Sequence, residues 1–170
     1  TWESIVQERI FTPFGMTSSV FTMEAMKKAQ DRGVPFDERR DSFELYPIPY
    51  YEGSVGSAPC EAIVSNVQDM SKWLIALMNQ GKYQGRQVLA PSILEATLEP
   101  AIPDENSDIK DFGYKELLNP FYGMGRDQAV YRGHPLTYHG GSMPGFYTQV
   151  SFMPEEGIGI LVFVMGPYAR

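Results

Sequence analysis

The residues best suited to chemistry form the segment YHGGSMPGF at positions 138–146, which sets His139, Gly140, Gly141 and Ser142 in a row. A catalytic wall needs a polar or cationic side chain that can bind a substrate or move a proton. It also needs a backbone edge free of side chains, on which the substrate can lie. His139 can supply the first and the two glycines the second. The plain alternative is a turn between strands, with His139 hydrogen-bonded in place.

The last third of the chain predicts the β-strands that must position this segment. Four stretches have strand character and are separated by glycine-containing turns: 121–133, 135–141, 145–154 and 157–165. Residues 158–165 are apolar at nearly every position, which predicts a central strand covered on both faces. The strands therefore predict an antiparallel sheet with helices on both faces.

The first hundred residues predict helices instead. Apolar residues repeat at helical spacing in four stretches, and glycine or proline follows each: 1–10, 23–31, 65–80 and 91–99. Ser65 and Gln68 fit a capping box at the start of the third helix. Pro91 suits the first turn of the fourth.

Two segments predict loops. Residues 34–62 combine prolines and glycines with five aromatic side chains, which predicts an ordered loop containing one short β-ladder. These aromatics and Tyr122 either wall a substrate cleft or pack the loop down, and packing is the favoured interpretation. The acidic stretch 103–111 predicts an exposed loop.

Composition narrows the class of protein. The chain has 170 residues, a net charge of −7 and no extended basic cluster, which argues against nucleic acid or an anionic membrane as partner. A single cysteine, Cys60, excludes an internal disulfide and a cysteine-based zinc ribbon or iron–sulfur site. No apolar run reaches the roughly 18 residues of a membrane span. We expect one α/β (α+β) domain over 1–170, with a helical part at about 1–100 and a sheet part at about 112–166.

Three ordered segments resemble the serine β-lactamase-like superfamily, in its class C β-lactamase, D,D-peptidase and esterase branch. They are ESIVQERIFTPFGMTSS, AIVSNVQDMSKWLIALMNQGKYQGRQVLAPSIL and YHGGSMPGFYTQVSFMPEEGIGILVFVM. Together they cover essentially the whole chain. The resemblance implies a β-lactamase/transpeptidase-like fold and an acyl substrate that is a small molecule or a peptide, with no cofactor and no metal.

In this family a serine in S-x-x-K is the nucleophile, a tyrosine in Y-x-N relays the proton, and a K-T-G or H-x-G triad faces them. His139, Gly140 and Gly141 match the H-x-G form. The resemblance implies that His139 is catalytic and that the glycines bind substrate. Ser142 matches the position whose backbone N–H completes the oxyanion hole, a role that does not require its hydroxyl.

The other two motifs depart from the family pattern. No Tyr-x-Asn or Ser-x-Asn occurs, and the single Ser-x-x-Lys, Ser107 to Lys110, lies in the acidic stretch rather than at the start of a buried helix. We therefore expect a chain that is incomplete at both ends relative to the family, inactive alone, and prone to self-association through exposed sheet edges.

Three rival interpretations remain. The chain could be a non-catalytic binding or scaffold protein on the same fold. His134 and His139 could be metal ligands, although no Asp, Glu or Cys joins them in a ligand pattern. HGGS also resembles the oxyanion segment of α/β-hydrolase lipases, but the G-x-S-x-G elbow of that fold is absent.

Overall fold

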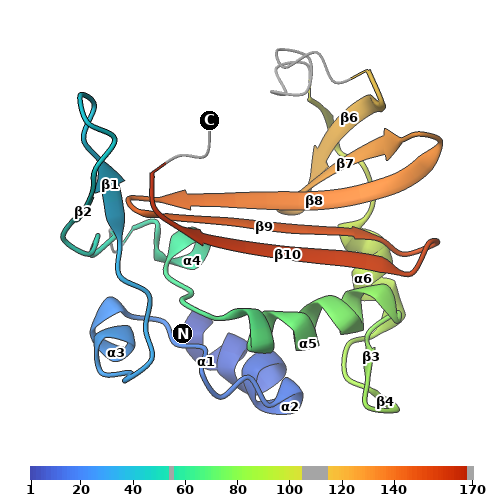
Figure 1. The fold of residues 1–170 in the computed structure, drawn as a ribbon. Coiled ribbons are helices and arrows are strands. Elements are labelled where there is room, and N and C mark those ends of the chain that lie inside the picture. The colour runs from blue at the N-terminus through green and yellow to red at the C-terminus, as the bar shows by residue number, and fades with distance from the viewer. Residues whose placement is uncertain (54–55, 105–114, 168–170) are drawn as a thin grey trace. The chain divides into compact units, whose positions relative to one another are not determined.

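The computed structural model describes residues 1–170 except 54–55, 105–114 and 168–170. Figure 1 shows its helices and strands, which follow the order helices first and sheet last. The helical segments are α1 Trp2–Val6, η1 Gln7–Phe11, α2 Thr12–Phe14, α3 Met23–Lys27, α4 Ala58–Glu61, α5 Val67–Met78 and α6 Pro91–Thr97. The strands are β1 Phe36–Glu38, β2 Leu45–Pro47, β3 Lys82–Tyr83, β4 Arg86–Gln87, β5 Ile102–Pro103, β6 Leu117–Gly123, β7 Arg126–Tyr131, β8 His134–Met143, β9 Phe146–Met153 and β10 Ile158–Met165.

The main sheet has six strands in the order β10-β9-β8-β7-β6-β5. Its antiparallel hairpins confirm the predicted class of helices followed by an antiparallel sheet. The predicted strand 121–133 is in fact a hairpin, because Met124 and Gly125 adopt positive φ angles of 41° and 75° and turn the chain between β6 and β7. Two short pairs, β1–β2 and β3–β4, lie outside this sheet.

The chain forms two compact units, and each unit consists of separate stretches of the sequence. The first unit comprises 1–71, 141–148 and 162–170, and the second comprises 72–140 and 149–161. The prediction that residues 1–170 act as one domain stays a prediction.

The first unit is built around the N-terminal helix. The helix continues from Trp2 through a π-helical stretch to Phe14, where Gly15 ends it with a φ of 62°. Phe11 and Phe14 are buried, and Phe11 stacks on Phe21 with ring centroids 4.9 Å apart. The helix predicted over 1–10 is therefore confirmed and extends slightly further.

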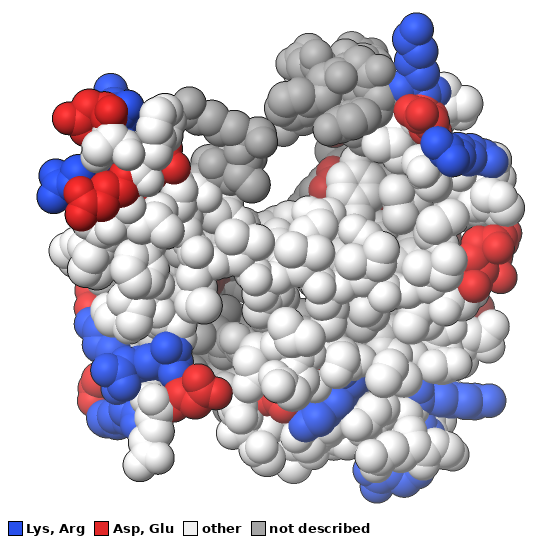
Figure 2. All heavy atoms as spheres, viewed as in Figure 1, with Lys and Arg blue, Asp and Glu red and all other residues white. Residues whose placement is uncertain are grey.

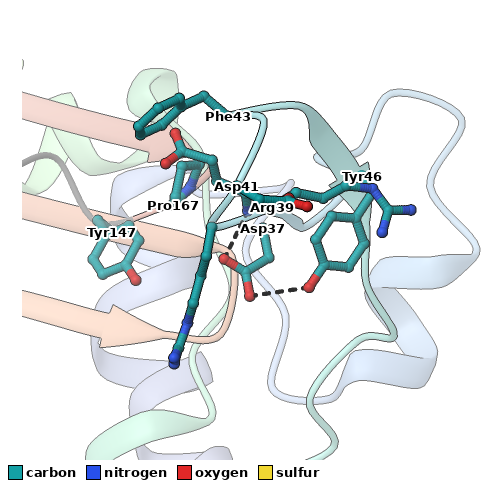
Figure 3. A pocket seen from close by; sticks show the side chains of 9 residues that line it. Asp37, Arg39, Asp41, Phe43, Tyr46, Tyr147 and Pro167 are labelled. Atoms are coloured by element: carbon teal, nitrogen blue, oxygen red, sulfur yellow. Dashed lines mark hydrogen bonds between the residues drawn. The ribbon is translucent and has the colours of Figure 1, made fainter.

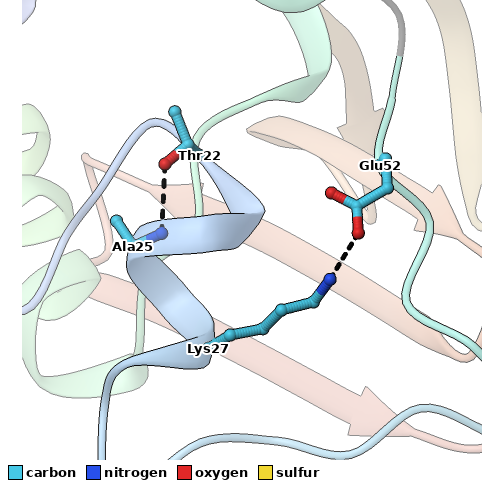
Figure 4. Close-up of polar contacts among 4 residues, drawn as sticks. All are labelled: Thr22, Ala25, Lys27 and Glu52. Carbon is cyan, nitrogen blue, oxygen red and sulfur yellow. Dashed lines mark hydrogen bonds and ion pairs between the residues drawn. The ribbon is translucent and has the colours of Figure 1, made fainter.

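Polar contacts fix the next helix of the first unit (Figure 4). The Thr22 hydroxyl accepts a hydrogen bond of 3.1 Å from the backbone N–H of Ala25, which caps the start of α3. At the other end of the helix, Lys27 pairs with Glu52 and lies 5.4 Å from the ring centroid of Tyr50. The loop that carries Glu52 is thereby attached to a helix 25 residues earlier.

Helix α5 begins with a different cap from the predicted one. The side chain of Asn66 accepts from the backbone N–H of Asp69 at 2.9 Å, so Asn66 occupies the capping position. The Ser65 hydroxyl instead bonds the Ser19 hydroxyl at 2.8 Å. The predicted capping box is wrong because Ser65 takes part in a tertiary contact.

The core of the second unit lies between helices and sheet. Leu74 and Leu77 of α5, Leu94 of α6 and Phe152 of β9 form one buried cluster. Gly159 of β10 lies against α5 so closely that a Cβ atom there would be 2.9 Å from the Leu74 side chain. Helices α5 and α6 therefore cover one face of this part of the sheet.

The opposite face of β10 corrects a prediction. This strand lies at the edge of the sheet, and its alternate residues Ile158, Ile160, Val162 and Val164 are 50%, 53%, 45% and 38% exposed. Residues 158–165 therefore form a strand as predicted, but the prediction that it is central and covered on both faces is wrong. Continuous apolar sequence cannot distinguish a buried strand from an exposed apolar edge.

Candidate functional site

The segment from His139 to Ser142 lies in β8, and all four of its residues are exposed. Strand β7 pairs with β8 from Tyr131↔His134 to Asp127↔Tyr138. Among the described residues the pairing of β7 with β8 ends at this row. Strand β8 continues beyond it through the H-x-G segment. That the glycines of this segment form an edge for a substrate backbone stays a prediction.

On the second unit, His139 has a specific neighbour. The Tyr122 hydroxyl of β6 lies 3.3 Å from Nε2 of His139, and the two ring centroids are 6.1 Å apart. Sequence reasoning considered Tyr122 only as packing or as a cleft wall. The register Tyr122↔Asp127 and Asp127↔Tyr138 places Tyr122 one row from His139, although the two residues are 17 positions apart in the sequence.

Asp127 adds a titratable group next to this pair. Burial raises the pKa of Asp127 above its ordinary value of 3.8, a positive charge on His139 lowers that pKa, and Asp104 raises it again. The net direction is upward, so folding favours the protonated carboxyl.

This pKa shift predicts a pH-dependent effect of Asp127→Asn. A carboxyl with a raised folded pKa binds more protons in the folded state than in the unfolded state. Stability therefore falls as pH rises from about 3.8 through the folded pKa, and the full cost is present above that pKa. Asp127→Asn should stabilise the chain more at pH 7 than at pH 3.5, as measured by urea unfolding of variant and parent. An equal effect at both pH values, or one matched by the exposed control Asp31→Asn, would contradict this account.

On the first unit, the rest of the segment is shaped by a tight hairpin. A Cβ atom at Gly141 would lie 2.7 Å from Oγ1 of Thr148 on β9, so only glycine fits there without a shift. Gly145 in the following turn has a φ of 77°, and a Cβ there would lie 2.5 Å from the Cβ of Pro35. The turn that follows Ser142 is therefore held against Pro35.

A concavity of about 770 Å³ lies beside the β1–β2 hairpin of the same unit (Figure 3). Its walls carry both charges and three aromatic rings: Asp37, Glu38, Arg39, Arg40, Asp41, Phe43, Tyr46, Tyr147 and Pro167. Tyr46 donates to Asp37 at 3.5 Å and lies under the Arg39 guanidinium, whereas Phe43 is 68% exposed. Packing therefore accounts for Tyr46 but not for Phe43.

The other residues considered from sequence lie elsewhere or are not described. Nδ1 of His134 contacts Glu156 at 2.6 Å, at the first residue of β8, whereas His139 lies in the middle of that strand. Within the described residues no group of three or more His, Cys, Asp or Glu side chains is arranged to hold a metal ion. Ser107 and Lys110 lie outside the described residues.

The distribution of charged side chains bears on the partner classes expected from the sequence. Figure 2 shows acidic and basic side chains in small mixed groups, with no continuous basic area on the face in view. The helices among the described residues are all too short or too polar to cross a bilayer.

Two curated relatives match nearly the whole chain at low sequence identity. Unguisins hydrolase ungD' of Aspergillus campestris is 24% identical over 161 residues, which cover 92% of this chain and 28% of that protein. Unguisins hydrolase ungD of Aspergillus violaceofuscus is 23% identical over 172 residues, which cover 97% and 30%. The chain thus spans less than a third of the length of these two relatives.

Among solved structures, the octameric penicillin-binding protein homologue from Pyrococcus abyssi superimposes with a TM-score of 0.79 at 20% identity, covering 97% of this chain and 34% of the other. A class C beta-lactamase gives a TM-score of 0.66 at 14% identity, covering 99% and 47%. These two structures confirm the β-lactamase/transpeptidase-like fold expected from the sequence.

The sequence profile of the Beta-lactamase family matches residues 1–169 of this chain. With essentially the whole chain matched, and with the fold and the H-x-G segment in place, this chain belongs to the beta-lactamase family.

Proposed function

We propose that this chain supplies one wall of an acyl-serine site that hydrolyses or transfers acyl groups of β-lactam, peptide or ester substrates. The observation that carries the proposal is the open edge of β8, where His139, Gly140, Gly141 and Ser142 are exposed beyond the end of the β7 pairing. An extended substrate backbone can align along such an edge. The relatives named as hydrolases support the reaction class.

Each residue of the segment has a proposed role. His139 donates a hydrogen bond to the substrate's carboxylate or takes part in the proton relay, and Gly140 and Gly141 leave room for the substrate backbone. The backbone N–H of Ser142 stabilises the negative charge that develops on the substrate's carbonyl oxygen. The sequence contains no Tyr-x-Asn, and its single Ser-x-x-Lys, at 107–110, lies in an acidic stretch. We therefore propose that the isolated chain binds an acyl substrate without turning it over.

A binding experiment tests the role of His139. The parent chain should bind acetyl-D-alanyl-D-alanine more tightly than the corresponding C-terminal amide, as measured by NMR titration. A hydrogen bond to a charged group contributes about 1.5–3 kcal/mol. His139→Ala should therefore weaken binding of the acid by about 10- to 100-fold and leave the amide little changed.

The matched control is His134→Ala, which removes the other histidine of β8. This control should retain the preference for the acid. Equal affinities for acid and amide in the parent chain would contradict the proposed site and favour a scaffold role on the same fold.

We also propose that copies of the chain associate through β10. Its exposed apolar residues lie on an edge strand, whose backbone can pair with a second chain. The name of the octameric homologue shows that a protein of this fold can assemble.

Sedimentation velocity tests this association. The parent chain should form concentration-dependent oligomers, and Val162→Lys should shift the population towards monomer because a charge on the edge strand opposes pairing. Met124→Lys, at a 71% exposed position outside β10, is the control and should not change the oligomers. A monomeric parent chain would exclude this proposal.

A further inference from the structure

Tyr122 and His139 are brought together by the sheet rather than by the sequence. They are 17 residues apart, on β6 and β8, and their polar atoms lie 3.3 Å apart. The contact occurs at the row where β7 stops pairing with β8, and His139 is the first residue of β8 beyond that row. The phenol thus contacts the residue at which the open edge begins.

A hydrogen bond at one ring nitrogen decides what the other nitrogen can do. A neutral imidazole has one N–H donor and one acceptor nitrogen, and the bond made by one nitrogen selects the tautomer. A phenol that donates to Nε2 leaves the ring proton on Nδ1. Among the described residues no hydrogen-bond partner of Nδ1 is present, so this nitrogen is available to a ligand.

We infer that Tyr122 is a positioning residue for His139: its hydroxyl donates to Nε2 and holds the ring in the tautomer that carries the proton on Nδ1. The ring then presents an N–H donor to the carboxylate of an acyl substrate while remaining neutral. Only this last step rests on the proposed function. The tautomer and the Tyr122 hydrogen bond are properties of the chain itself.

The surrounding charges are compatible with this arrangement. Asp127 is the acidic neighbour whose pKa is affected by His139, and Asp104 acts on the same carboxyl. Neither carboxyl appears as a hydrogen-bond partner of the His139 ring among the described residues, whereas the Tyr122 hydroxyl lies 3.3 Å from Nε2. The Tyr122 phenol is therefore the group placed to select the ring tautomer.

Nitrogen-15 NMR of the two histidines tests the inference without any need for catalysis. The chain contains only His139 and His134, so His134→Gln assigns both rings. At a pH where the ring is neutral, His139 should show a protonated Nδ1 and an unprotonated, hydrogen-bonded Nε2. In Tyr122→Phe the ring should lose this single state and populate both tautomers, while the melting temperature stays within a few degrees.

Tyr131→Phe, on β7 at the row of His134, is the matched control and should leave the His139 signals unchanged. A proton on Nε2 in the parent chain, or identical His139 signals in parent and Tyr122→Phe, would overturn the inference.

The binding assay separates this inference from the proposed function. Tyr122→Phe should reduce the preference for the acid over the amide peptide by about 3- to 10-fold, because a ring that exchanges tautomers presents its donor for less of the time. An unchanged preference in Tyr122→Phe would overturn the link between the tautomer and substrate binding. A parent chain without the preference would overturn the proposed function, whereas the NMR result would still decide the role of Tyr122.

Discussion

Asp69→Ala is expected to lower the free energy of unfolding by about 2–5 kcal/mol, measured by urea unfolding. Asp69 is 2% exposed and accepts from the backbone N–H of Ser18 at 2.8 Å and from the Ser19 hydroxyl at 3.0 Å. Removing the carboxylate leaves both donors without this acceptor, and each such donor costs about 1–3 kcal/mol. The loss is large beside a typical domain stability of about 5–15 kcal/mol.

Two variants identify the cause. Asp69→Asn keeps one oxygen acceptor and should cost less than Asp69→Ala, and the exposed substitution Asp31→Ala should cost about 0.5 kcal/mol or less. If Asp69→Ala were as stable as Asp31→Ala, the Ser18–Ser19–Asp69 contacts would not hold the first unit together.

Gly145→Ala is expected to destabilise the chain by about 2–4 kcal/mol. Its φ of 77° costs a residue with a Cβ about 1–2 kcal/mol. In addition, the new Cβ would lie 2.5 Å and 2.8 Å from the Cβ and Cα atoms of Pro35, which belong to a rigid ring and backbone. The turn must therefore move, and it follows Ser142 by three residues. Thermal unfolding measures the stability, and backbone NMR shifts of residues 141–148 report the movement.

Gly157→Ala is the matched control for the backbone conformation. Gly157 has a φ of 66° in a comparable hairpin turn, but nothing lies within 4 Å of the Cβ position. It should lose only the conformational part, about 1–2 kcal/mol. Equal losses at both positions would show that contact with Pro35 does not hold the turn.

The sequence predicted the parts of the fold that depend on local pattern. The apolar spacing of 65–80 and Pro91 placed α5 and α6, and glycine turns separated the last strands. The pattern could not show where those strands lie in the sheet. The apolar run 158–165 therefore predicted a central strand, although β10 is at the edge.

The candidate site divides in the same way between local and distant information. His139-x-Gly is a contiguous motif and could be read directly, whereas the partner Tyr122 depends on the register of β6, β7 and β8. The same reason explains why the sequence wrongly predicted Ser65 as the helix cap. Its hydroxyl contacts Ser19, a residue 46 positions away in the sequence. Contacts set by tertiary packing leave no periodic signal in the sequence.

The central proposal is that the chain carries a substrate wall without the nucleophile that would face it. Incubation with nitrocefin and with a p-nitrophenyl ester, followed by intact-mass spectrometry, tests it most directly. The account predicts no turnover above the buffer rate and no acyl adduct on the chain. Turnover that is abolished by Ser107→Ala, or a stable adduct on any serine of the chain, would contradict it.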